Sequence, residues 1–202
     1  MKRVHLNASA VLAAAILIVG CSSANPRPTT DVLNEEAPDW VYDPSADWDA
    51  DDEPFVYYAT GMGRIGMNLN LAEAEAHSDA MSDIQAFLET TIERLGEYYA
   101  QEAGDLLDED TKSSFVNNEL FTRELVSGTV SGARIAGKWW DQDYIYVRLK
   151  FDAEDQFLGA YQQSLAARLR QKTRELTQKD KESMRSELER LVTERNEMLE
   201  EG

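Results

Sequence analysis

The sequence is poor in the residues that most often form cross-links or bind metals. Its 202 residues include one cysteine, Cys21, and two histidines. One cysteine cannot form a disulfide within the chain, so it is a free thiol, an intermolecular partner or a modified group. His77 is the only histidine after residue 20, and it has neither a second histidine nor a cysteine to share a metal with. A packed or half-buried imidazole is the prediction, and we assign no catalytic, cofactor-binding or metal-ligating residue.

Basic residues are also scarce. The chain has 20 lysines and arginines against 38 acidic residues, with a formal charge of −18 and a pI near 4.4. Such a charge excludes typical nucleic-acid binders and proteins that adhere to anionic lipid, because both depend on positive charge. Residues 168–202 are balanced, with nine basic and nine acidic side chains, so the excess lies earlier. The charge favours a cationic or neutral partner.

Long apolar runs are absent except at the amino terminus. Lys2 and Arg3 precede an almost unbroken apolar stretch from Leu6 to Val19. A helix needs about 20 apolar residues to span a bilayer, so this stretch is too short. A basic head followed by an apolar core of this length is typical of a secretory signal peptide. We predict that residues 1–20 are a signal peptide.

The signal ends in Ile18-Val19-Gly20-Cys21, which resembles the bacterial lipobox. The resemblance implies that the Cys21 sulfur receives a diacylglycerol, that cleavage occurs just before it, and that the new amino terminus is acylated. Two or three acyl chains make a stable anchor, whereas one holds a protein only marginally. Ser22 replaces the aspartate that tends to retain lipoproteins in the inner membrane, so the resemblance favours the outer membrane, with the domain facing the periplasm.

The next segment predicts a tether and then an acidic turn. Residues 21–37 are expected to be a lipidated flexible tether that reaches roughly 20 Å as a random coil. Asp47, Asp49 and Asp51 alternate as in the start of a calcium loop. However, Asp52 occupies the position of the turn glycine, and Tyr58 that of the closing glutamate. A solvated acidic turn is the better prediction, and weak cation binding by residues 47–53 stays open.

Three glycines raise the question of a nucleotide site. Gly61-x-Gly63-x-x-Gly66 follows an expected strand at 55–60, which is the context of a dinucleotide fingerprint. A Rossmann unit also needs a second parallel strand soon after its helix, and here an antiparallel hairpin is expected instead. Nicotinamide nucleotides are moreover intracellular. We predict that the glycines let the chain leave the strand and turn into a helix at a place where side chains would clash.

The remaining patterns predict an α+β fold, a small sheet of about three strands with a long helix packed across it. The helix is expected to begin at Leu71 and to be capped by Asn70. An acidic loop is expected at residues 101–118. Residues 120–140 and Tyr144–Phe151 are expected to pair as a hairpin around 141–143. The apolar stripe of the long helix consists of Ala74, His77, Met81, Ile84, Leu88, Ile92, Leu95 and Tyr99.

After Ala153 the composition is strongly helical and lacks proline. Two apolar stripes are separated by a polar segment, and no heptad is sustained. We predict a long C-terminal helical tail whose distal half projects or pairs weakly, and which also offers a surface for self-association. The expected domains are 38–152, an α/β lipoprotein domain, and 153–202, a charged C-terminal helix. The stripes are Phe157, Tyr161, Leu165 and Leu169, and then Met184, Leu188, Leu191 and Met198.

The order of short motifs resembles a known family. After the lipobox come Pro38-Asp39-Trp40-Val41, then Tyr57-Tyr58-Ala59-Thr60-Gly61-x-Gly63, an alanine-rich helix, and Tyr144-Ile145-Tyr146-Val147. This order resembles the Lpp-twenty lipoprotein family, a Helicobacter-type outer-membrane lipoprotein domain. That family is similar to the flagellar outer-membrane lipoprotein P and to the amino-terminal domain of flagellar assembly protein T. The resemblance covers about residues 38–152 and implies a compact domain without enzymatic activity.

These observations favour a non-enzymatic lipoprotein of the outer membrane, a structural or assembly module of the cell envelope that is flagellum-associated in some relatives. Its expected partners are the membrane, through Cys21, and an envelope protein of the flagellum or cell wall. The alternative is a periplasmic lipoprotein regulator that binds a peptidoglycan synthase. A third hypothesis, an enzyme or ligand binder built around Trp139, Trp140 and the glycine turn, is weaker than simple packing of the tryptophans.

Overall fold

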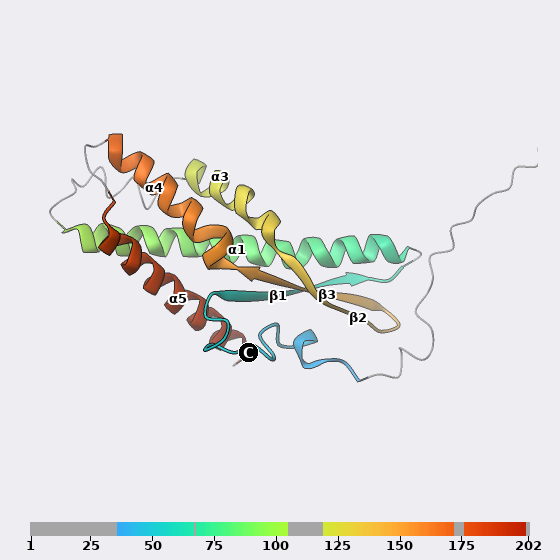
Figure 1. Ribbon diagram of the computed structural model, residues 1–202. Helices are drawn as coiled ribbons and strands as arrows, with labels where there is room; N and C mark the ends of the chain where they lie inside the picture. The colour runs from blue at the N-terminus through green and yellow to red at the C-terminus, as the bar shows by residue number, and fades with distance from the viewer. Residues whose placement is uncertain (1–35, 67, 105–118, 172–175, 201–202) are drawn as a thin grey trace, which may run out of the picture.

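A computed structural model describes residues 36–66, 68–104, 119–171 and 176–200. Within them, three antiparallel strands form one sheet in the order β1-β3-β2. A 35-residue helix, α1 (Leu69–Ala103), lies across one face of the sheet, as Figure 1 shows. The predicted α+β class, with a three-stranded sheet, a long helix packed on it and helical structure at the C-terminal end, is therefore confirmed.

Strand β1 (Val56–Arg64) is longer than its aromatic run predicts, because it continues through Gly61 and Gly63. It pairs with β3 (Tyr144–Asp152) along its whole length, with Ala59 opposite Leu149. β2 (Arg134–Trp140) forms the predicted hairpin with β3, and its register shifts between Ile135 and Gly137. Such a bulge on an edge strand discourages pairing with other chains.

Helix α1 begins two residues before the predicted start. The side chain of Asn68, not Asn70, accepts hydrogen bonds from the backbone amides of Asn70 and Leu71, at 3.0 and 3.3 Å. The predicted stripe is right from Ile84 onward and wrong in the first turns. There Ala72, Ala76 and Ala80 are buried, whereas Ala74 is exposed and His77 only half-buried. The small side chains face the sheet because the helix approaches β1 very closely at this end.

Residues 120–129, which we expected to belong to the first arm of the hairpin, are helical instead. They lie in α3 (Glu119–Thr129), followed by the 3-10 turn η4 (Val130–Gly132). Leu125, Val126, Thr129 and Val130 are buried, so buried positions recur at intervals of three and four residues, which suits a helix rather than a strand. The predicted loop at 101–118 is wrong for residues 101–103, which are the last residues of α1, and residues 105–118 lie outside the described residues.

The C-terminal part forms two helices rather than one projecting helix. A π-helical turn, η5 (Glu154–Leu158), leads into α4 (Gly159–Gln171), and α5 (Gln178–Glu200) follows. Figure 1 shows α3 and α4 on one side of α1 and α5 on the other. Met184, Leu188 and Val192 of α5 are fully buried in the same hydrophobic cluster as α1 and the sheet. The expectation that the distal half projects is therefore wrong, because its apolar stripe closes the core.

The second face of the sheet is partly covered by the segment before β1, which includes the short turn η2 (Asp39–Val41). Trp40 lies over Gly137, where an added Cβ would stand 3.1 Å from the indole. Thr60 donates to the Trp40 carbonyl at 3.0 Å, and the Arg148 guanidinium donates to the Ala46 carbonyl. These contacts hold residues 40–46 on the sheet.

One buried residue joins α5 to β1 and to the segment before β1. Asn196 of α5 is fully buried, and its Nδ2 donates to the Val56 carbonyl at 2.9 Å. Its own backbone carbonyl accepts from the hydroxyl of Ser45, itself 1% exposed, at 3.3 Å. A buried amide with such partners fixes the position of α5 relative to β1 and to the preceding segment.

Candidate functional site

The sequence-predicted modification site, Cys21, lies outside the described residues. The same holds for residues 1–20 and for most of the tether at 21–37. Lipidation therefore stays a prediction. None of the described helices is long and apolar enough to cross a bilayer.

The glycine motif does not form a loop between strand and helix. Gly61 and Gly63 lie inside β1 and face α1, and only Gly66 lies in the connection. A Cβ on Gly61 would overlap the backbone of Ala76 and Ala80, and one on Gly63 would overlap the carbonyl of Ala72. The glycines thus allow a helix backbone to rest directly on the strand. The expectation that they turn the chain out of the strand is wrong for Gly61 and Gly63, whereas the expectation that side chains would clash there is confirmed.

The two cation-related candidates lie apart. Asp49 accepts hydrogen bonds from the backbone amides of Asp51 and Asp52, at 2.9 and 3.4 Å, in an exposed turn. His77 is half-buried on α1, in a shallow depression it shares with Asn70 and Glu73. In the part of the chain that the structure describes, no three histidine, cysteine, aspartate or glutamate side chains are placed to hold a metal ion.

Trp139 and Trp140 point to opposite faces of the sheet. Trp140 packs against the core on the α1 side, whereas Trp139 lies beside Tyr146 on the second face, with ring centroids 5.6 Å apart. Neighbouring residues in a strand alternate in this way. One ligand site built around both indoles is therefore not formed.

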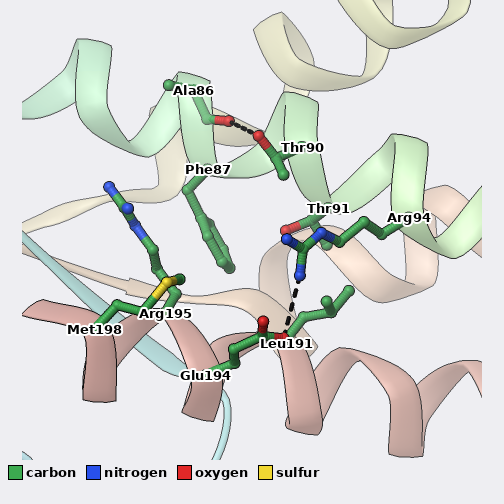
Figure 2. Close-up of a pocket in the computed structure, with 9 residues that line it drawn as sticks. All are labelled: Ala86, Phe87, Thr90, Thr91, Arg94, Leu191, Glu194, Arg195 and Met198. Carbon is green, nitrogen blue, oxygen red and sulfur yellow. Dashed lines mark hydrogen bonds and ion pairs between the residues drawn. The ribbon is translucent and has the colours of Figure 1, made fainter.

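A cavity of about 330 Å³ lies between α1 and α5, and we take it as the candidate functional site. The sequence does not predict this cavity, because the apolar stripe of α5 is equally consistent with a separate tail. Figure 2 shows its lining from both helices. Its residues are Ala86, Phe87, Thr90, Thr91 and Arg94 of α1, and Leu191, Glu194, Arg195 and Met198 of α5.

The floor of this cavity is apolar and buried. Phe87 and Leu191 are 6% and 4% exposed, and the Phe87 ring stacks on Tyr57 with centroids 4.3 Å apart. Met198, by contrast, is 49% exposed at the rim. Methionine is flexible and polarizable, so it adapts to differently shaped partners.

The rim is charged on both sides. Arg94 donates to Glu194 at 3.1 Å, and Glu194 also accepts from Arg190 at 2.9 Å. Arg195 lies 3.4 Å from Asp83. These side chains are more than a third exposed, so each pair contributes little to stability, about 1 kcal/mol at most. These ion pairs fix the positions of the rim side chains rather than hold the two helices together.

Beneath the rim, the hydroxyl of Tyr57 donates to Asp83 at 2.7 Å. Burial raises the pKa of Tyr57 well above its ordinary value, and the neighbouring Asp83 carboxylate raises it further. The Thr90 hydroxyl donates to the Ala86 carbonyl at 3.0 Å. An apolar floor with a charged rim suits the side chain of a partner molecule better than it suits a chemical step.

Comparison with models of known protein families gave no match, and comparison with curated proteins gave none.

Proposed function

We propose that this protein is a lipid-anchored lipoprotein of the bacterial outer membrane that faces the periplasm and acts as a non-enzymatic structural or assembly module of the cell envelope. The observation that carries the proposal is Cys21, placed directly after a basic head, an apolar run and Ile18-Val19-Gly20. The order of motifs in residues 38–152 supports membership of the Lpp-twenty lipoprotein family and, with it, a flagellum-associated role.

Substitution of the anchor tests the location. In cells that express the full chain, Cys21→Ala is expected to move the protein from the outer-membrane fraction to the soluble periplasmic fraction, because a single residue carries all the acyl chains. Lys138→Ala, which removes an exposed ion pair to Glu73 on the folded domain, is the matched control and is expected to stay with the membrane. Equal fractionation of wild type and Cys21→Ala would contradict the anchor.

The cavity between α1 and α5 is where we propose that an envelope partner docks. A photoreactive phenylalanine analogue placed at Met198 should then crosslink to a partner in living cells. The same analogue at Leu120, which is 66% exposed on α3, is the control, because α3 and α5 lie on opposite sides of α1 in Figure 1. Capture of a flagellar ring or rod protein from Met198 alone would support the assembly role.

The alternative, a regulator of a peptidoglycan synthase, needs a longer reach. A tether of about 15 residues spans roughly 20 Å as a coil, and a projecting helix would have added about 1.5 Å per residue. Because α5 packs against α1, its residues add no such reach. Capture of a cell-wall synthase from Met198 would nevertheless replace the assembly role by the regulatory one.

A further inference from the structure

The second face of the sheet has a covered half and an open half. Residues 43–53 cover Tyr58, Arg148 and Lys150, through the bonds of Arg148 to Ala46 and of Glu53 to Tyr58 and Lys150. Nearer the hairpin turn, Met62, Tyr146 and Trp139 stand opposite one another on the three strands. We call these three residues, two of which are aromatic, the aromatic row. It runs across the whole width of the sheet.

The aromatic row reaches solvent. Met62 is 47% exposed, and the side chains of Tyr146 and Trp139 are partly exposed. Two further tyrosines extend it. Tyr144 lies 6.5 Å from Tyr146 between ring centroids. Tyr42, in the segment before β1, is 81% exposed, and it is among the groups that raise the pKa of Tyr146 after burial and Asp141. Rigid aromatic side chains gathered at a surface in this way are typical of recognition sites.

The charge around the aromatic row is mainly negative. Asp141 and Asp143 form the adjoining hairpin turn, and Asp39 is exposed in η2 next to Tyr42. Arg64, opposite Tyr144, is an exposed basic side chain at this end of the sheet, whereas Arg148, two residues along β3 from Tyr146, is held by the Ala46 carbonyl and the Tyr58 ring. Burial, followed by the negative charge of Asp141, raises the pKa of the Tyr146 hydroxyl. The surface is therefore complementary to a cation rather than to an anion.

On the covered half of the same face, two cationic side chains of this protein already contact an aromatic ring and a carboxylate. The Arg148 guanidinium lies over the Tyr58 ring, 4.0 Å from its centroid, and the Tyr58 hydroxyl donates to Glu53 at 2.7 Å. Lys150 forms an ion pair with Glu53 and lies 5.9 Å from the same ring. Among the described residues, the cation–ring contacts involve Phe55, Tyr57, Tyr58 and Phe121, and none involves the aromatic row.

We propose that the aromatic row, extended by Tyr42 and Tyr144, binds an arginine-rich segment of a partner protein. Guanidinium groups stack on tryptophan and tyrosine faces, and the aspartates of the turn balance their charge. This surface lies on the opposite side of the sheet from α1 and hence from the cavity between α1 and α5. The inference depends on neither lipidation nor that cavity.

The test uses the full chain with Cys21→Ser, so that no lipid anchor enters the measurement. The probe is a fluorescent decapeptide of alternating arginine and glycine, and its binding is followed by anisotropy near physiological salt. Trp139→Ala and Tyr146→Ala are each expected to raise the Kd roughly three- to fivefold. Asp141→Asn is expected to raise it roughly two- to threefold. Asparagine keeps the oxygen that accepts from the amides of Asp143 and Tyr144, so the turn is retained.

Two controls separate this surface from diffuse attraction between a polycation and an acidic protein. Glu93→Gln removes one exposed charge on α1 and should leave the Kd unchanged, whereas Tyr146→Phe keeps the ring and should bind like wild type. Urea unfolding shows that each variant is folded. An equal loss in Glu93→Gln and Asp141→Asn would overturn the proposal. Two other results would also overturn the proposal, each with peptide binding unchanged in Trp139→Ala. In the first, this variant loses binding to phosphatidylethanolamine–phosphatidylglycerol vesicles. In the second, it loses self-association.

Discussion

At the scale of single residues, the close approach of α1 to β1 depends on two glycines of β1. Gly61 and Gly63 have no Cβ, and the backbone of α1 at Ala72, Ala76 and Ala80 occupies that space. Protein interiors are packed as densely as organic crystals, so an added methyl group there forces the helix away from the sheet. The glycines are therefore a packing device in this protein rather than a phosphate-binding loop.

We predict that Gly61→Ala and Gly63→Ala each lower the free energy of unfolding by at least about 2 kcal/mol. Gly66→Ala is the matched control, because a Cβ there meets no atom within 4 Å, and its effect should be within about 0.5 kcal/mol. Urea unfolding followed by circular dichroism measures all three. Equal stability of the Gly61 and Gly66 variants would show that α1 does not rest on β1 in solution.

Tyr57 makes stability sensitive to alkaline pH. Its pKa is raised in the folded protein above the ordinary value of 10.0, by burial and by Asp83. The neutral hydroxyl is therefore favoured by folding, so its contribution is fully present below about pH 10 and is lost as the pH rises above that value.

We predict that Tyr57→Phe costs about 1 kcal/mol at neutral pH, because Asp83 loses a hydrogen bond. The same variant should lose less stability than wild type between pH 9 and pH 11, since it has no hydroxyl to ionise. Urea midpoints at both pH values provide the measurement. Parallel declines in the two proteins would mean that Tyr57 ionises equally easily in the folded and unfolded chains.

At the scale of elements, α5 is a structural part of the body. Leu188 is fully buried, and Asn196 bonds to both β1 and the segment before it. We predict that Leu188→Ala lowers the free energy of unfolding by about 2–4 kcal/mol. Glu197→Gln on the exposed side of α5 should have little effect.

A chain ending at residue 175 should expose its core and bind a hydrophobic dye. A truncated chain that is fully folded and does not bind the dye would contradict the packing of α5.

The hairpin and the long helix could be predicted because their signals are local. Ile145, Val147, Leu149 and Phe151 alternate, and Ile84 to Tyr99 follow a helical period. The packing of α5 could not be predicted, because its stripe is equally consistent with a free amphipathic helix. The same is true of the cavity, whose lining comes from two helices about 100 residues apart in the sequence.

At the scale of the whole molecule, 38 acidic residues against 20 basic ones give a formal net charge of −18. Like charges repel within a compact protein, and salt screens this repulsion over about 10 Å at 0.1 M. The exposed ion pairs lose little on screening, because each contributes little. Net repulsion is therefore the dominant electrostatic term that salt changes.

We predict that raising sodium chloride from about 10 mM to about 200 mM raises the urea midpoint of unfolding. Potassium chloride at equal ionic strength should act in the same way, because screening does not distinguish the two cations. A fall in the midpoint would mean that favourable ion pairs outweigh repulsion.

We propose above that Cys21 anchors the protein to a membrane. Mass spectrometry of the amino-terminal peptide of the protein purified from bacterial envelopes tests it most directly. We predict a peptide that begins at Cys21 and carries a diacylglycerol on its sulfur and an acyl chain on its amino group. An unmodified Cys21, or an amino terminus elsewhere, would contradict the account.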